Sequence, residues 1–337
     1  MYVEKYDDSD YSRQHYKNSL FELCQTRKNL KKKDSVNRIR NVLENQEQNR
    51  LELRKMLGSP LCDAYPETPP KGKMEFLGCR DEARIYRVCI KMEENIPFYG
   101  LLFVKSESKK APFVIFQHGA NGTPERAAGI LEDGSTNYND VVKRILGNGA
   151  NVFLPQLYLW DITEFDSHND FRSKIDATLK QTGSSIAAYE IFFIMRAIDY
   201  LCEMDVVDSE RIAMAGLSYG GFFTLYTMAL DERIKCGISC SFYNDRLIYN
   251  NRSDWIWFDS GGRFTDNEIV SLIYPRGIDL YVGDSDKVFD AEFATAEFSI
   301  LKEVCETKEW AKLTIFEGSH EFFKDDKAIK NLMKNLS

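Results

Sequence analysis

The chain has 337 residues, of which 43% are hydrophobic, 28% charged and 13% aromatic. This composition is that of an ordinary globular protein and excludes a mostly disordered, collagen-like or coiled-coil chain. The net charge of −8 argues against a nucleic-acid-binding protein, which needs a basic face. No apolar run of 18 or more residues is present, so we expect no membrane-spanning helix and no membrane partner.

The amino terminus and the cysteines favour a cytoplasmic protein. The first five residues are polar and lack the apolar segment of a signal peptide. The eight cysteines are scattered, and Cys236 and Cys240, which lie close together, have no second pair and no nearby histidine. We therefore expect reduced thiols, no metal site and no cofactor.

Residues 1–70 are predicted to form an N-terminal helical extension. Apolar residues stand among charges up to Leu57, and the sequence Gly58-Ser59-Pro60 stops the helical pattern. Residues 1–58 carry a net charge of +4, although the whole chain is acidic. The extension either covers the main domain or mediates a homodimer, and the sequence leaves both alternatives open.

Residues 71–337 have the pattern of an α/β domain. The first two strand-like runs are predicted to form an antiparallel pair, and later runs alternate with helical stretches at 186–204, 222–230, 291–306 and 324–336. This alternation predicts a mostly parallel sheet of roughly eight strands with helices on both faces. The predicted strands are 84–92, 98–105, 112–117, 151–154, 212–215, 236–241, 279–282 and 312–316.

Two long connections, 158–183 and 243–275, are predicted to be lid or pocket loops. Connections of this length in a compact domain usually carry binding function. Arg172 or Arg246, one from each connection, is a candidate for binding a substrate carboxylate. The candidate substrate-binding residues are Asn121, Trp160, Tyr243, Trp255 and Trp257.

The sequence Gly216-Leu-Ser218-Tyr-Gly220 predicts a nucleophile elbow. The G-x-S-x-G pattern follows an apolar strand-like run and opens a helix-like run, which is the setting that this motif requires. Small residues two positions before and after the serine allow the helix to approach the strand closely. Ser218 is therefore the predicted nucleophile.

A serine nucleophile needs a base and an acid that orients the base. His320 follows the last predicted strand, where the carboxyl ends of parallel strands form ligand sites, and is the predicted base. Asp286 is the preferred acid, with Asp284 on the same turn as the alternative and Asp290 as a further candidate. The chain order serine, aspartate, histidine is the order of α/β-hydrolases.

The oxyanion hole is expected to use two backbone N–H groups. One belongs to Tyr219, the residue after the nucleophile. The other comes from the loop His118-Gly119-Ala120-Asn121-Gly122, where we prefer Ala120 and expect His118 to be structural.

With these residues in place, the chain resembles an α/β-hydrolase of the serine esterase type, within the group related to dienelactone hydrolase and acetyl xylan esterase. The resemblance rests on the segments 116–122, 207–221, 283–286 and 318–320. It implies an α/β-hydrolase fold and a small-molecule ester substrate, with a short acyl group such as acetyl. It also implies a Ser-His-Asp triad that forms an acyl-enzyme.

Two other functions remain as alternatives. A peptidase or amidase like the prolyl oligopeptidases would use the same triad, although 70 residues leave no room for the β-propeller that usually precedes their catalytic domain. The other alternative is a non-catalytic binding protein derived from a hydrolase. The complete set of nucleophile, acid and base argues against this hypothesis.

Overall fold

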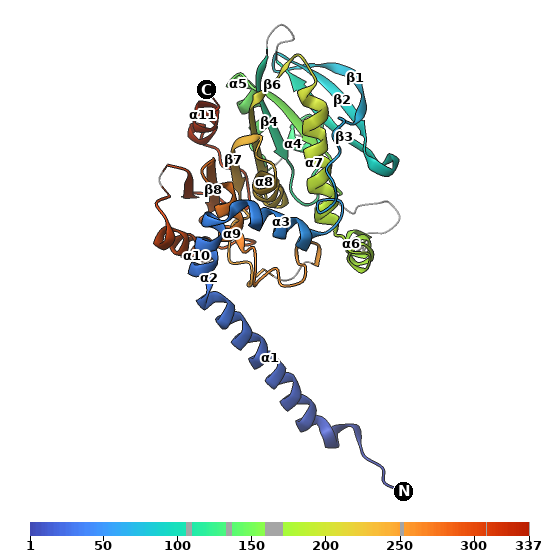
Figure 1. Ribbon diagram of the computed structural model, residues 1–337, viewed down its shortest axis with the longest axis vertical. Coiled ribbons are helices and arrows are strands. Elements are labelled where there is room, and N and C mark those ends of the chain that lie inside the picture. Colours follow the sequence, from blue (N-terminus) through green and yellow to red (C-terminus); the bar gives the residue numbers. More distant parts are fainter. Residues whose placement is uncertain (106–109, 133–136, 159–170, 250–252, 308, 337) are drawn as a thin grey trace.

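A sheet with the strand order β1-β2-β3-β5-β4-β6-β7-β8-β9 forms the centre of the molecule (Figure 1). The computed structural model describes residues 1–105, 110–132, 137–158, 171–249, 253–307 and 309–336. The strands are β1 Lys71–Arg80, β2 Ala83–Lys91, β3 Pro97–Val104, β4 Ala111–Gln117, β5 Asn151–Pro155, β6 Val207–Leu217, β7 Ile234–Cys240, β8 Gly277–Gly283 and β9 Ala311–Phe316.

The sheet is antiparallel at one end and parallel over the rest. Strands β1, β2, β3 and β5 pair antiparallel, whereas β5, β4, β6, β7, β8 and β9 pair parallel. The predicted antiparallel pair and parallel sheet are confirmed. The sequence analysis missed β1, an edge strand with exposed Met74 and Phe76, because its residues lack a buried alternating face.

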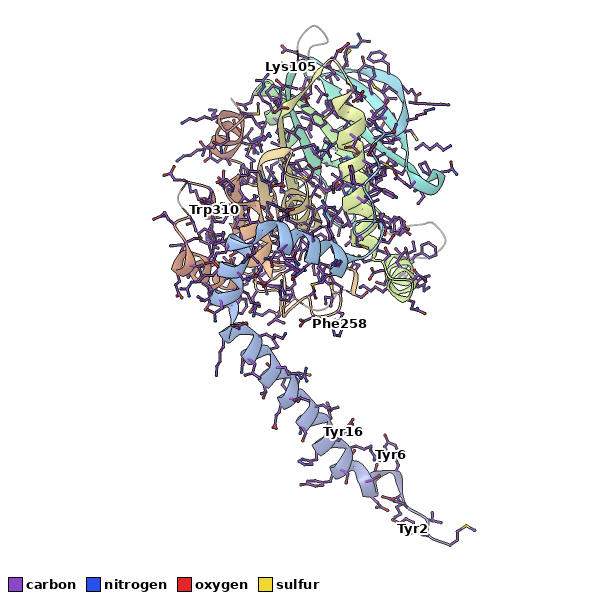
Figure 2. The ribbon with its side chains drawn as sticks, viewed as in Figure 1. Tyr2, Tyr6, Tyr16, Lys105, Phe258 and Trp310 are labelled. Atoms are coloured by element: carbon purple, nitrogen blue, oxygen red, sulfur yellow. The ribbon has the colours of Figure 1, made fainter. Side chains whose placement is uncertain are left out.

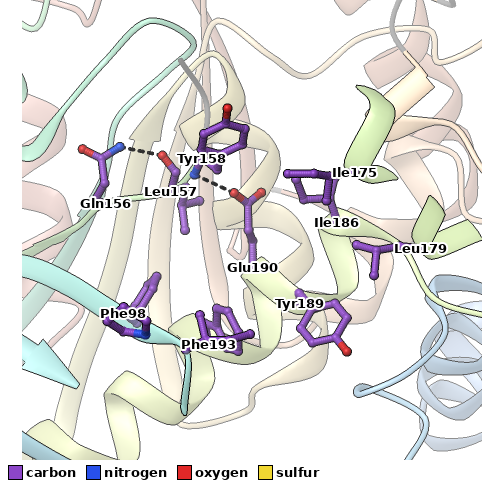
Figure 3. A pocket seen from close by; sticks show the side chains of 12 residues that line it. Phe98, Gln156, Leu157, Tyr158, Ile175, Leu179, Ile186, Tyr189, Glu190 and Phe193 are labelled. Carbon is purple, nitrogen blue, oxygen red and sulfur yellow. Dashed lines mark hydrogen bonds between the residues drawn. The ribbon is translucent and has the colours of Figure 1, made fainter. Parts of the chain in front are cut away.

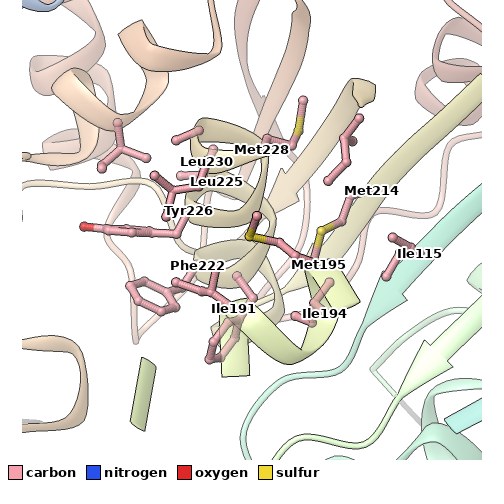
Figure 4. Packing of buried hydrophobic residues seen from close by; sticks show 14 of the residues in the cluster. Ile115, Ile191, Ile194, Met195, Met214, Phe222, Leu225, Tyr226, Met228 and Leu230 are labelled. Atoms are coloured by element: carbon pink, nitrogen blue, oxygen red, sulfur yellow. The ribbon is translucent and has the colours of Figure 1, made fainter. Parts of the chain in front are cut away.

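Helices cover both faces of the sheet. One face is packed by α7 (Ile186–Cys202) and α8 (Tyr219–Leu230), whose side chains meet Ile115 of β4 and Met214 of β6 (Figure 4). The opposite face is packed by α5 (Val141–Gly147) and α11 (Lys327–Lys334) against the alternate residues Val114 and Ala213 of the same strands. Because successive strand residues point to opposite faces, fully apolar runs are required in these central strands.

The helices have the following bounds within the described residues. The sequence predicted α7, α8, α10 and α11 near these positions. The short 3₁₀ turns are Tyr6–Ser9, Glu93–Asn95 and Ser253–Trp255. The α-helices are α1 Asp10–Lys33, α2 Ser35–Glu44, α3 Gln46–Leu57, α4 Pro124–Ala127, α5 Val141–Gly147, α6 Phe171–Gln181, α7 Ile186–Cys202, α8 Tyr219–Leu230, α9 Asp266–Ile273, α10 Ala291–Val304 and α11 Lys327–Lys334.

The N-terminal segment divides into a projecting helix and two packed helices. Helix α1 extends away from the body and buries none of its residues, and both Tyr16 on this helix and Tyr6 just before it are exposed (Figures 1 and 2). Its C-terminal end is held by Lys31, whose Nζ lies 3.1 Å from Oδ1 of Asp259. In contrast, α2 and α3 bury Ile39, Val42, Leu53 and Leu57 in the same core as the sheet.

The two long connections contain helices that the sequence analysis did not predict. Helix α6 lies in the connection 158–183, and α9 lies in the connection 243–275. None of the described helices is long and apolar enough to cross a bilayer. All eight cysteines are free, and Cys89 is exposed rather than buried.

Candidate active site

Ser218 lies at the sharp turn between β6 and α8. Its backbone has φ 59° and ψ −117°, a conformation that non-glycine residues rarely adopt. A Cβ atom on Gly220 would overlap the carbonyl oxygen of Gln117, and one on Gly216 would overlap that of Gly220. The Ser218 amide donates to the carbonyl oxygen of Cys240 at 2.8 Å, which fixes the turn against β7. The glycine pair thus permits the strained serine that a nucleophile elbow needs.

His320 and Asp286 form a hydrogen-bonded pair at the ends of β9 and β8. The Nδ1 atom of His320 lies 2.9 Å from Oδ2 and 3.2 Å from Oδ1 of Asp286. Oδ1 also accepts hydrogen bonds from the backbone amides of Val288 at 2.8 Å and Phe289 at 3.0 Å. Burial raises the pKa of Asp286, but the hydrogen bond and charge of His320 and the two amides outweigh burial, so the pKa lies below its ordinary value.

The other two candidate carboxylates have structural roles. Asp284 accepts from the backbone amide of Gly318 at 3.2 Å and so joins the two loops. Asp290 caps α10 by accepting from the amide of Glu292 at 2.7 Å. Asp286 is the carboxylate of the three that contacts His320.

The parallel strands bring these segments to one edge of the sheet. Ser218 follows β6, Asp286 follows β8 and His320 follows β9, and β6 to β9 are neighbours in the sheet. The loops after β8 and β9 touch, because a Cβ atom on Gly283 would lie 2.5 Å from the carbonyl oxygen of Gly318. The ring of Phe289 stacks on the ring of His320 with centroids 6.0 Å apart, which limits the orientations of the imidazole.

The loop after β4 lies directly against Ser218. A Cβ atom on Gly119 would lie 3.2 Å from Cβ of Ser218. The next residues turn sharply, since Asn121 has φ 55° and the amide of Gly122 donates to the carbonyl oxygen of Gly119 at 3.1 Å. Ala120 is exposed, and within the described residues its amide makes no hydrogen bond. The loop therefore presents the Ala120 amide beside the elbow.

His118 is a structural residue that links this loop to the segment after β5 by hydrogen bonds. It is fully buried, and Nδ1 lies 2.9 Å from the carbonyl oxygen of Gly119, to which it donates. Nε2 accepts from the backbone amide of Leu157 at 3.2 Å. Burial lowers the pKa of His118 to about 4, so the ring is neutral near pH 7. Its place is the one expected from the sequence.

A buried network connects the elbow to α6 and α7. The hydroxyl of Tyr219 donates to Asp254, 2.9 Å from Oδ1 and 2.8 Å from Oδ2. Nε of Arg172 donates to Oδ2 of Asp254 at 2.6 Å, and Nη2 donates to Oε2 of Glu190 at 2.7 Å. The guanidinium also lies over the Tyr219 ring, 5.7 Å from its centroid. No local sequence pattern predicts this network, because Arg172, Glu190, Tyr219 and Asp254 lie on separate segments of the chain.

The arginine candidates for a substrate carboxylate are wrong. Arg172 is occupied by Glu190 and Asp254, as described. Nη2 of Arg246 lies 2.8 Å from Oδ1 of Asp266, and both residues are buried. Each charge is already balanced inside the fold, so neither guanidinium is available to an incoming anion.

Two of the candidate pocket residues belong to the core instead. Tyr243 is fully buried and hydrogen-bonds to Asn267, and Trp257 packs edge-on against Tyr226 with centroids 5.6 Å apart. The expectation that these two residues line the substrate pocket is therefore wrong. An aromatic residue in the sequence fits a core and a pocket equally well.

Of the other candidates, two lie near the elbow and one lies outside the described residues. Trp255 stacks on Tyr219 with centroids 4.9 Å apart. Asn121 is exposed on the turn beside Ser218. Trp160 lies outside the described residues. Within the described residues, no group of three or more histidine, cysteine or acidic side chains is arranged to hold a metal ion.

The chain is similar to known proteins in sequence and in fold. Residues 189–270, from α7 to α9, match the model of the Prolyl oligopeptidase family. A protein of Bacillus subtilis (strain 168) named "Putative hydrolase YtaP" is 27% identical over 257 residues, which cover 72% of this chain and 83% of that protein.

Two solved structures share the arrangement of the whole domain. The glucuronoyl esterase from Solibacter usitatus is 15% identical with a TM-score of 0.59, and 87% of this chain and 92% of that chain are covered. Acetyl xylan esterase 1 from Thermoanaerobacterium sp. JW/SL YS485 is 14% identical with a TM-score of 0.55, covering 88% of this chain and 94% of that chain. The chain thus has an α/β-hydrolase fold with an elbow serine and a histidine–aspartate pair at one edge of its sheet.

Proposed function

We propose that this protein hydrolyses carboxylic esters through Ser218, His320 and Asp286. The observation that carries the proposal is the contact between His320 and Asp286 at the same sheet edge as the strained Ser218. The similarity to a hydrolase, to an acetyl xylan esterase and to a glucuronoyl esterase supports it.

In the proposed reaction, Nε2 of His320 accepts the proton of the Ser218 hydroxyl as Oγ attacks the ester carbonyl. Asp286 accepts the hydrogen bond from Nδ1, which holds the ring with Nε2 unprotonated and stabilises the imidazolium that forms. The amides of Ala120 and Tyr219 donate to the oxyanion. His320 then protonates the leaving alcohol, and water releases the acyl group by the same route.

A short acyl group, such as acetyl, is the preferred acyl part. The rings of Phe242, Trp255 and Phe289 pack beside the site, with Trp255 against Tyr219 and Phe289 against His320. The cavity left among them has a volume of about 10 Å³, which is close to the space of a single water molecule. In the proposal, the acyl group lies against these rings, where a long chain would need them to move.

The test is hydrolysis of p-nitrophenyl acetate and longer p-nitrophenyl esters by the purified protein, with Ser218→Ala in parallel. We expect activity on the acetate that falls by at least about 10⁴-fold in the variant. Covalent labelling by a fluorophosphonate, lost in Ser218→Ala, is a second readout. Equal hydrolysis by both proteins would refute the role of Ser218.

Amide hydrolysis is a second candidate, because residues 189–270 match the Prolyl oligopeptidase family. The same triad performs both reactions, so its geometry does not separate them. Comparing kcat/KM for aminoacyl arylamides with that for short aryl esters decides between the two. We expect the esters to be preferred.

The cysteines support a cytoplasmic location, which we also propose. All eight are free, and disulfides are rare in reducing compartments. Fractionation of the native host, with the protein followed by antibody, tests the location.

A further inference from the structure

A large apolar cavity lies beside the candidate active site, between the start of β3, the end of β5 and the helices α6 and α7. Its volume is about 440 Å³, within the range of small-molecule sites. Figure 3 shows side chains from these elements surrounding it. The walls that matter here are formed by Phe98, Leu157, Ile175, Leu179 and Phe193.

Two chains of contacts join this cavity to the predicted oxyanion hole. On one side, Leu157 in its wall donates to His118, which anchors the loop that carries Ala120. On the other side, Glu190 in its wall binds Arg172, whose guanidinium lies over the ring of Tyr219. Two residues of the cavity wall, Leu157 and Glu190, are therefore linked through His118 and Arg172 to the segments that carry the predicted oxyanion-hole amides.

The polar groups of the wall do not make this an anion or sugar site. Both oxygens of Glu190 are engaged, Oε1 by the amide of Tyr158 at 2.8 Å and Oε2 by Arg172 at 2.7 Å. Gln156 contacts His118 and the carbonyl oxygen of Leu157. The remaining surface is mainly aliphatic and aromatic, so the favourable occupant is an apolar group.

We propose that this cavity binds an apolar, aryl or alkyl alcohol part of the ester, so that the preferred substrates are short-chain esters of apolar alcohols. This inference rests on the proposed esterase function. Its two parts follow from two cavities of very different size. The cavity among Phe242, Trp255 and Phe289 has a volume of about 10 Å³, whereas the cavity at α6 and α7 offers about 440 Å³.

The experiment compares two acetates of primary alcohols with similar acidity, 2-naphthylmethyl acetate and 2-methoxyethyl acetate, with acetate release followed by pH-stat. We expect kcat/KM to be at least about 10-fold higher for the naphthylmethyl ester. Leu179→Trp, which narrows the cavity, is expected to remove this preference by lowering kcat/KM for the naphthylmethyl ester. Ala177→Trp, on the exposed side of the same helix, is the matched control.

A second variant tests whether the effect of Leu179→Trp comes only from a distortion of the structure by the indole ring. Ile175→Gln keeps the volume but adds an amide, and it should also reduce the preference for the naphthyl ester. Equal rates for the two acetates in the native protein would overturn the proposal. So would a Leu179→Trp effect that appears only when the acyl chain of p-nitrophenyl esters is lengthened, since the cavity would then hold the acyl group.

Binding measured without turnover separates this inference from the proposed function. Calorimetric titration of 2-naphthalenemethanol into Ser218→Ala should give a binding signal that Leu179→Trp removes. If no ester is cleaved but this alcohol binds in that manner, the cavity assignment stands and the esterase proposal falls. If esters are cleaved but this alcohol does not bind, the cavity assignment falls.

Discussion

Nδ1 of His320 lies 2.9 Å from Oδ2 of Asp286, although the two residues are 34 positions apart in the chain. The contact depends on two parallel strands, β8 and β9, that end at the same edge of the sheet. It also depends on Asp284, which ties the loop after β8 to Gly318. Two carboxylates thus position His320. Asp286 contacts its ring, and Asp284 joins the two loops that carry the pair.

Replacing Asp286 by asparagine tests the first of these roles. The amide side chain keeps the size but no longer favours a proton on Nδ1, so His320 is expected to lose its basic Nε2. We expect kcat for p-nitrophenyl acetate to fall by about 10³-fold or more at pH 7. Asp284→Asn is the matched control and should cost less than about 10-fold. Equal losses in both variants would contradict the assignment.

The elbow glycines make a prediction about stability. Alanine at Gly216 or Gly220 would place Cβ on a backbone carbonyl group, so we expect a loss of about 3 kcal/mol in the free energy of unfolding, or failure to fold. Gly147 ends α5 and has open space around it, and Gly147→Ala should leave stability unchanged or raise it slightly. Urea unfolding of the three variants gives the comparison.

His118 makes a prediction about pH. Its pKa is about 4 in the folded protein because of burial, against an ordinary value of 6.5, so below pH 6.5 the unfolded chain binds more protons than the folded one. Stability is therefore lost as the pH falls from 6.5 towards 4, by about 2 kcal/mol at pH 5 from this residue alone.

The measurement for this prediction is urea unfolding at pH 7 and pH 5. His118→Gln lowers stability at pH 7 but should show a smaller loss between the two pH values than the native protein. An unchanged pH dependence in this variant would mean that His118 does not remain neutral in the fold.

The buried network makes a prediction about ion pairs. Arg172→Met leaves Glu190 and Asp254 buried without the cation that balances their charge, and we expect a loss of about 3–5 kcal/mol in unfolding free energy. Arg87, which lies 3.6 Å from Glu75 on the surface, is the control, and Arg87→Met should cost less than about 1 kcal/mol. Similar losses of unfolding free energy in the two variants would contradict the view that burial makes this network important for stability.

The sequence predicted the parts of the molecule that have local signals. Alternating strands and helices predicted the parallel sheet, and small residues around Ser218 predicted the elbow, because each pattern lies within a few residues. The rule that parallel strands end at one edge placed His320 near the turn of Asp284 and Asp286, of which Asp286 was preferred for its place on that turn. These features need no knowledge of distant contacts beyond that rule.

The remaining features depend on contacts that no local pattern encodes. Arg172 and Asp254 are 82 positions apart, and nothing in either segment indicates that they pair. Tyr243 and Trp257 looked like pocket walls because aromatic residues suit a core and a pocket equally well. Strand β1 was missed because an exposed edge strand needs no alternating apolar face.

Arg172 has a consequence for how this protein can diverge. One guanidinium binds the carbonyl oxygen of Tyr158 as well as Asp254, so both borders of the segment 159–170 are fastened at a single point next to the elbow. We therefore expect changes in the length of that segment to leave Ser218 in place. Because one guanidinium balances both carboxylates, we expect positions 172, 190 and 254 to be exchanged together in related chains.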